Sequence, residues 1–124
     1  MRLRLTPMAA AVFLISSPAV SQDSDGCYAP TQDCVTITSE WKNNDFYARF
    51  KNSCQGRIYM RFCNEQEGGR EDCGASGVDQ GERKTWRTGD KATGRTSARW
   101  LGSQNGSKDW VCSSKVSGWK DDMF

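Results

Sequence analysis

CVTITSEWKNNDFYARFK, residues 34–51, decides the fold class of this chain. Apolar side chains fall at alternate positions in both halves of the stretch, which is the pattern of half-buried β-strands. They are Val35, Ile37 and Trp41 in the first half and Phe46, Ala48 and Phe50 in the second. Between the halves, residues 42–45 (KNND) are typical of a turn. The stretch therefore predicts an antiparallel hairpin in which Glu40 lies opposite Tyr47.

The alternation continues on the C-terminal side of this hairpin. Residues 57–62 (RIYMRF) form a third strand pattern, in which Ile58, Met60 and Phe62 share the apolar face. The short connection 52–56 predicts that the three strands make an antiparallel meander. Residues 64–81 are rich in glycine and acid and have no periodicity, so we expect a loop there.

Strand patterns resume later in the chain. They cover residues 83–88 and 95–101, and Asn105-Gly106 predicts a hairpin turn before a return strand at 108–112. No segment after residue 22 repeats apolar residues at helical spacing over three turns. The sequence predicts an all-β fold: a small, disulfide-stapled antiparallel meander sandwich or barrel of about six strands.

The N-terminal residues have the composition of a secretory signal. Basic residues precede a short apolar run at 8–15, and small residues follow it at 19–21. We expect residues 1–21 to be removed on export, which leaves 22–124 as a single disulfide-rich β domain. The apolar run is too short to cross a bilayer, which needs about 20 residues. We therefore expect a secreted or periplasmic protein without integral membrane association.

Charge and composition exclude several function classes. The chain has 17 basic and 15 acidic residues, and loss of Arg2 and Arg4 with the signal leaves it formally neutral. A neutral chain gives no support for a nucleic-acid partner. There is no histidine, so the Ser-His-Asp and Cys-His mechanisms lack a component. We expect a protein that is not an enzyme and uses no cofactor.

The six cysteines all lie after the predicted signal, and an even number in an exported domain predicts three disulfides. The hairpin register brings Cys34 close to Cys54. We expect the pairs Cys34–Cys54, Cys63–Cys73 and Cys27–Cys112, with Cys27–Cys34 as an alternative. The cysteine spacing contains no Cys-x-x-Cys pair, so we expect no metal site of this kind.

The acidic stretch 64–72 is a candidate calcium loop because four carboxylates lie in it. They are Glu65, Glu67, Glu71 and Asp72. Their spacing does not match the D-x-[DN]-x-[DN]-G pattern, and Arg70 stands among them. A solvated turn without a bound metal is the expected structure.

Arginine and tyrosine alternate on the polar faces of two predicted strands. In the meander register, Arg49 lies opposite Tyr59 and Tyr47 lies opposite Arg61. Such pairs are compatible with a solvated surface of cation–aromatic contacts and with a face that recognises carboxylates, phosphates or sugars. These four residues are candidate ligand-binding residues.

Tryptophan is abundant for a small domain, and indole rings stack on sugar faces or fill partner pockets. Alternation places Trp41 and Trp100 in the core. Trp86 and Trp110 share their faces with lysines, so we expect them to be exposed and to bind ligand, with Trp119 as a third candidate.

These features favour three functions. The leading hypothesis is a noncatalytic exported binding module for envelope polysaccharide or glycan. An alternative is a secreted or periplasmic protein inhibitor that inserts the loop 63–73 into the cleft of an enzyme. The third is a small carboxylate-dependent glycosidase, which needs two acids such as Glu40, Glu65 or Glu82 about 5 to 10 Å apart.

Overall fold

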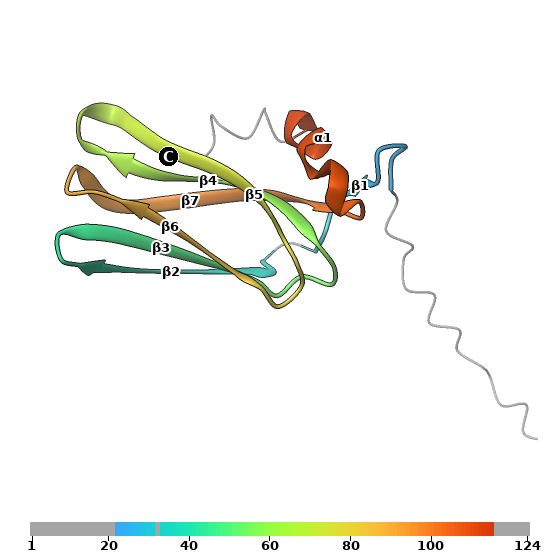
Figure 1. Cartoon of the computed structure of the whole chain (residues 1–124), viewed down its shortest axis with the longest axis horizontal. Coiled ribbons are helices and arrows are strands. Elements are labelled where there is room, and N and C mark those ends of the chain that lie inside the picture. Colours follow the sequence, from blue (N-terminus) through green and yellow to red (C-terminus); the bar gives the residue numbers. More distant parts are fainter. Residues whose placement is uncertain (1–21, 32, 116–124) are drawn as a thin grey trace, which may run out of the picture.

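A computed structural model of the chain describes residues 22–31 and 33–115, which form two antiparallel β-sheets packed face to face (Figure 1). The strand orders are β1-β7-β4-β5 in one sheet and β2-β3-β6 in the other. The strands are β1 (Cys27–Tyr28), β2 (Val35–Lys42), β3 (Asp45–Asn52), β4 (Ile58–Gln66), β5 (Arg70–Val78), β6 (Arg83–Thr88) and β7 (Ala92–Ser103). Short 3₁₀ turns lie at Glu67–Gly69 and Gly106–Lys108, and α1 spans Asp109–Ser113. The predicted all-β sandwich is confirmed, whereas the predicted signal at 1–21 and Trp119 lie outside the described residues.

The hairpin of β2 and β3 has the predicted register. Val35 faces Asn52 at one end, Glu40 faces Tyr47, and Lys42 faces Asp45 at the turn. The two turn residues, Asn43 and Asn44, have φ values of 52° and 65°. Two consecutive left-handed residues twist the chain in the sense that a two-residue hairpin needs, and asparagine tolerates that conformation better than most residues.

The predicted three-stranded meander is wrong, because β4 leaves the sheet that contains β3. The second neighbour of β3 is β6, and β4 lies between β7 and β5 in the other sheet. Asn52 explains the change of sheet. Its buried side chain donates to the carbonyl oxygens of Gly56 and Val78 and accepts from the Cys54 amide at 2.8 Å. These bonds fix the 52–56 connection as a crossing between sheets.

The predicted loop 64–81 is also wrong over most of its length. β4 continues to Gln66, the chain turns through Glu67–Gly69, and β5 returns along β4 with Cys63 opposite Cys73. The low strand propensity of these residues gave the wrong prediction. β5 is paired with β4 along its whole length, so the backbone ladder and the disulfide hold it as a strand although its side chains are acidic or small.

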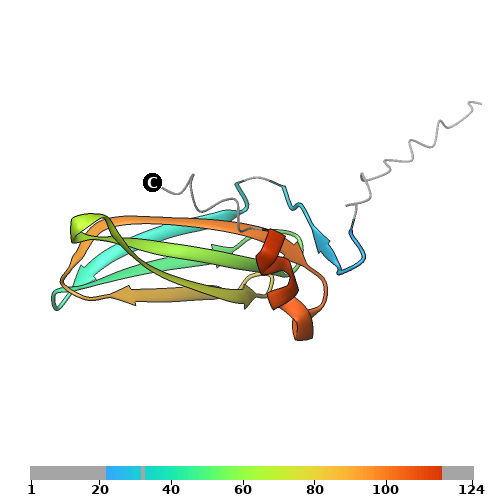
Figure 2. The same ribbon diagram turned by 90° about the horizontal axis from the view of Figure 1, so that it is seen from above.

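The return strand predicted at 108–112 is wrong as well, because this segment forms α1. Asp109 is buried and accepts hydrogen bonds from the Arg57 Nε at 2.9 Å and the Ser103 hydroxyl at 2.7 Å. The Asn105 side chain accepts a hydrogen bond from the Ser107 amide at 3.3 Å and starts the preceding 3₁₀ turn. Figures 1 and 2 show α1 at one end of the sandwich, with the turns of the three hairpins at the other end.

The core lies between the two sheets and is rich in aromatic rings. Five large side chains are almost fully buried, and each contributes roughly 1.5–3 kcal/mol to stability by burial. They are Phe46, Phe50, Ile58, Met60 and Phe62. The rings of Phe50 and Phe62 stack across the two sheets with centroids 5.2 Å apart. The alternation read from the sequence assigns all five correctly.

All three predicted disulfides are present. They join Cys27 to Cys112, Cys34 to Cys54 and Cys63 to Cys73. The first ties β1 to α1 over 85 residues of sequence, and the second closes the base of the β2–β3 hairpin. The third joins β4 to β5, so each bridge limits how far the two segments that it connects can separate.

Candidate functional site

The predicted arginine and tyrosine face is divided between the two sheets. Tyr47 and Arg49 point outward from β3, and Tyr59 and Arg61 point outward from β4 in the opposite sheet. The predicted pairs Arg49 with Tyr59 and Tyr47 with Arg61 are therefore wrong. Arg49 instead forms an ion pair with Glu40 at 2.7 Å and lies 5.9 Å from the centre of the Tyr47 ring.

Trp86 belongs to the inside of the sandwich, so its predicted exposure is wrong. It pairs with Ala48 on the core face of β3, and its ring lies 4.9 Å from that of Phe62. The indole N–H donates to the carbonyl oxygen of Asp72 at 3.0 Å, which links β6 to β5. Lys84, on the same face of β6, is half-buried at the rim of the core. The lysine on the same face of the strand therefore led to a wrong prediction for a tryptophan that packs inside.

Trp110 is 68% exposed, as expected from the sequence. It lies on α1, and its carbonyl oxygen accepts a hydrogen bond from the Ser113 hydroxyl at 2.6 Å. Its binding of a ligand stays a prediction.

Trp41 is the exposed aromatic residue that the sequence pattern assigned to the core. Its side chain is 51% exposed, and Ile37 on the same face of β2 is 39% exposed. The indole packs on Phe46 with ring centroids 5.3 Å apart. A Cβ built on Gly94 of β7 would lie 3.6 Å from the indole nitrogen, so the opposite sheet presents only backbone there. Val35, Ile37 and Trp41 form an apolar line that we name the Trp41 strip.

The Trp41 strip is exposed because β2 is an edge strand. β3 lies over the central strands of the other sheet and is buried at every second residue, whereas β2 has no fully buried residue. One feature of the sequence marks this difference. Ser39 interrupts the apolar face of the first strand, while the core face of 46–50 has no polar residue.

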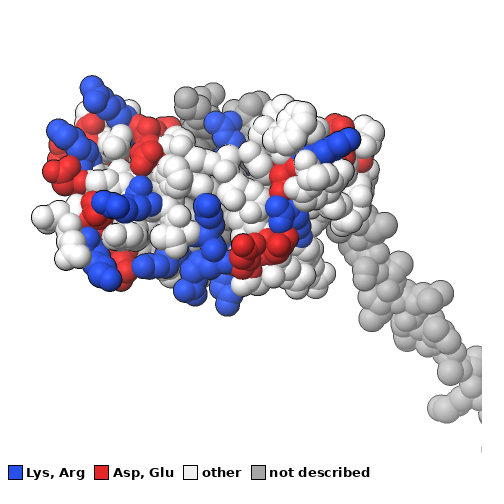
Figure 3. Space-filling model, in the orientation of Figure 1, with Lys and Arg blue, Asp and Glu red and all other residues white. Residues whose placement is uncertain are grey.

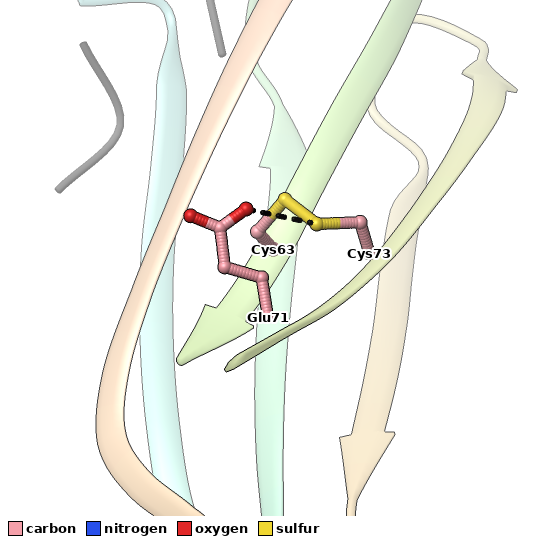
Figure 4. A group of neighbouring side chains, drawn as sticks. All are labelled: Cys63, Glu71 and Cys73. Atoms are coloured by element: carbon pink, nitrogen blue, oxygen red, sulfur yellow. Dashed lines mark hydrogen bonds between the residues drawn. A yellow bond between two sulfur atoms is a disulfide. The ribbon is translucent and has the colours of Figure 1, made fainter. Parts of the chain in front are cut away.

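The acidic hairpin contains one close group of potential metal ligands, shown in Figure 4. Ligand atoms of Cys63, Glu71 and Cys73 lie within 4.8 Å of one another, and a Glu71 oxygen is 3.6 Å from the Cys73 sulfur. Because both sulfurs belong to a disulfide, neither is a thiolate ligand or a proton donor. The contact is therefore a carboxylate beside a disulfide.

Other carboxylates of the hairpin already have partners. Asp72 accepts a hydrogen bond from the Thr88 hydroxyl at 2.7 Å, and Glu65 lies 3.5 Å from Arg95 in an ion pair. Glu71 stands directly opposite Glu65 across the ladder of β4 and β5. A catalytic role for this pair of acids stays a hypothesis.

Charges of both signs are mixed over the face seen in Figure 3. This distribution agrees with the equal numbers of acidic and basic residues after position 21. Over residues 22–31 and 33–115, no helix has the length and apolar character needed to span a membrane.

The described residues thus define a disulfide-stapled β-sandwich whose exposed indoles, Trp41 and Trp110, lie outside the core. Comparison with protein-family models, with curated proteins and with solved structures finds no match to this chain.

Proposed function

We propose that this protein is an exported, noncatalytic binding module for envelope polysaccharide or glycan, and that the Trp41 strip is its main contact surface. The three disulfides favour an oxidising compartment outside the cytosol.

The half-exposed indole of Trp41 is the observation that carries the proposal. It is supported from beneath by Phe46 and flanked by a glycine backbone, so one large apolar surface is held in place and open to solvent. A rigid indole loses little conformational entropy when a sugar ring stacks on it, and this favours binding. The neighbouring Ile37 extends the apolar surface along β2.

The test is a titration with a panel of envelope polysaccharides, followed by isothermal calorimetry and by tryptophan fluorescence. We expect saturable binding by the unmodified protein and a loss of at least about tenfold in affinity for Trp41→Ala, which corresponds to about 1.4 kcal/mol. Trp110→Ala removes the more exposed indole, on α1 at the other end of the sandwich, and reports separately on the binding predicted for Trp110. Equal affinities for the unmodified protein and Trp41→Ala, or a panel without binding, would reject the proposal.

A second candidate, an enzyme inhibitor, is favoured by the rigidity of the β4–β5 hairpin. The ladder pairs residues from Ile58 with Val78 to Gln66 with Arg70, and the bridge between Cys63 and Cys73 crosses it. The tip, Glu67–Gly69, is exposed and held ready for insertion in a cleft. Inhibition of a secreted hydrolase that is abolished by Glu67→Lys, with no polysaccharide bound, would select this function.

A further inference from the structure

The outer edge of β2 has unpaired backbone groups at every second residue among the described residues. The Ser53 amide donates to the Cys34 carbonyl oxygen at 2.8 Å, so this pair is hydrogen-bonded across β2 and β3. In an antiparallel ladder such pairs alternate, so the even-numbered residues of β2 bond to β3. The N–H and C=O groups of Val35, Ile37, Ser39 and Trp41 therefore point away from the sheet.

We propose that a second copy of this chain pairs with this edge, antiparallel and about a two-fold axis through Ser39. Ser39 then faces Ser39 of the second copy, and Ile37 of each copy faces Trp41 of the other. Odd-numbered residues of one copy face odd-numbered residues of the other, so their outward backbone groups meet in hydrogen-bonded pairs. The two three-stranded sheets become one sheet of six strands.

The side chains of β2 favour this register over the one that is shifted by a residue pair toward the turn. Ile37 opposite Trp41 is a β-branched and aromatic pair, a combination that stabilises antiparallel sheets. On the outer face, Glu40 and Lys42 each meet a threonine of the other copy, and Glu40 keeps its 2.7 Å ion pair with Arg49. A register shifted by one residue pair toward the turn would place Glu40 directly opposite Glu40, which is unfavourable.

An exposed edge strand with an apolar face readily pairs with a strand of another chain unless charged residues or prolines prevent it, and β2 has neither on that face. It has eight residues, no proline and no charge among its odd-numbered residues. A two-fold axis closes the contact after two copies, so the pairing yields a dimer and not a fibre.

The dimer has a consequence for ligand binding, although it does not depend on what Trp41 binds. The two Trp41 residues lie on the same face of the joined sheet, separated by four residues along the strand direction and by one strand spacing. This places them about 14 Å apart. A polymer with a repeated unit can therefore contact both indoles at once.

Sedimentation equilibrium over a range of protein concentrations tests the proposal. We expect reversible dimers, and we expect Ser39→Pro to raise the dimer dissociation constant roughly ten- to hundredfold, because the two-fold axis removes two hydrogen bonds at once. Proline is tolerated there because the Ser39 amide points away from β3. Circular dichroism and thermal melting of Ser39→Pro should match those of the unmodified protein and establish that it folds.

A second variant reports on the register. Ser39→Cys adds one thiol to a chain whose described cysteines are all paired, and on the two-fold axis it should oxidise to a covalent dimer. Thr38→Cys is the control, since in this register its Cα atoms lie about 8 Å apart and beyond disulfide reach. A monomer at all concentrations, a dimer that persists in folded Ser39→Pro, or cross-linking by Thr38→Cys in place of Ser39→Cys would overturn the proposal.

Discussion

Replacement of Asp109 by alanine should destabilise the protein strongly, because this carboxylate joins α1 to the end of the sandwich. Its side chain is only 11% exposed, and it accepts hydrogen bonds from Arg57 and Ser103. Loss of one member of a buried charged pair costs about 3–5 kcal/mol, and hydrogen bonds to charged groups contribute about 1.5–3 kcal/mol. The Arg57 side chain is 26% exposed, so water replaces part of the lost contact. We expect a loss of about 3 kcal/mol in the free energy of unfolding.

Urea denaturation with the disulfides intact measures this loss, and thermal melting should show a Tm lowered by roughly 12–20 °C. Asp79→Ala is the matched control, because Asp79 pairs with the same guanidinium but its side chain is 68% exposed. An exposed ion pair contributes less than about 1 kcal/mol. Equal losses for the two variants would refute the reasoning that burial of Asp109 makes its contact with Arg57 strong.

Two further predictions concern aromatic residues. Trp86→Ala should lower the free energy of unfolding by about 3–4 kcal/mol and Trp41→Ala by about 1 kcal/mol, because of these two only Trp86 packs between the sheets. Denaturant titrations measure both losses, and a larger loss for Trp41→Ala would contradict the packing of Trp86 between the sheets. Burial raises the pKa of Tyr28, whose hydroxyl donates to the Arg57 carbonyl oxygen at 3.0 Å. Its contribution to stability is therefore constant below pH 10.0 and falls as the pH rises above it, through the raised pKa of the folded state. Tyr28→Phe should show a smaller decline in this range, and identical pH profiles would argue against the effect.

Local patterns predicted the β2–β3 hairpin and the core residues of β3 and β4 correctly. Alternation assigned Phe46, Phe50 and Phe62 to the interior, and the pair Asn43-Asn44 marked the turn. Alternation and turn composition both depend only on residues that are close in the sequence, so both can be recognised without the tertiary structure. The same local reasoning failed for 64–81, since β5 is held by its ladder with β4 and not by the propensity of its residues.

The candidate site was predicted less well than the fold. Trp110 is exposed as expected, but Trp86 is packed inside and Trp41 is open to solvent. Alternation identifies which face of a strand a residue occupies, but not whether another sheet covers that face. Position at the sheet edge, beside a glycine of β7, Gly94, decides the exposure of Trp41.

The sequence by itself determined the β class, the first hairpin and the pairing of Cys34 with Cys54, because alternation, turn chemistry and covalent reach act over short distances. Tertiary structure alone decided that β4 crosses to the other sheet, that residues 109–113 become helical and that Trp41 faces solvent. Each of these outcomes depends on groups distant in sequence, such as the Asn52 amide that bonds to Val78 and the Arg57 guanidinium that bonds to Asp109. The energies of such contacts exist only once the two sheets have packed, so no short segment of the chain contains them.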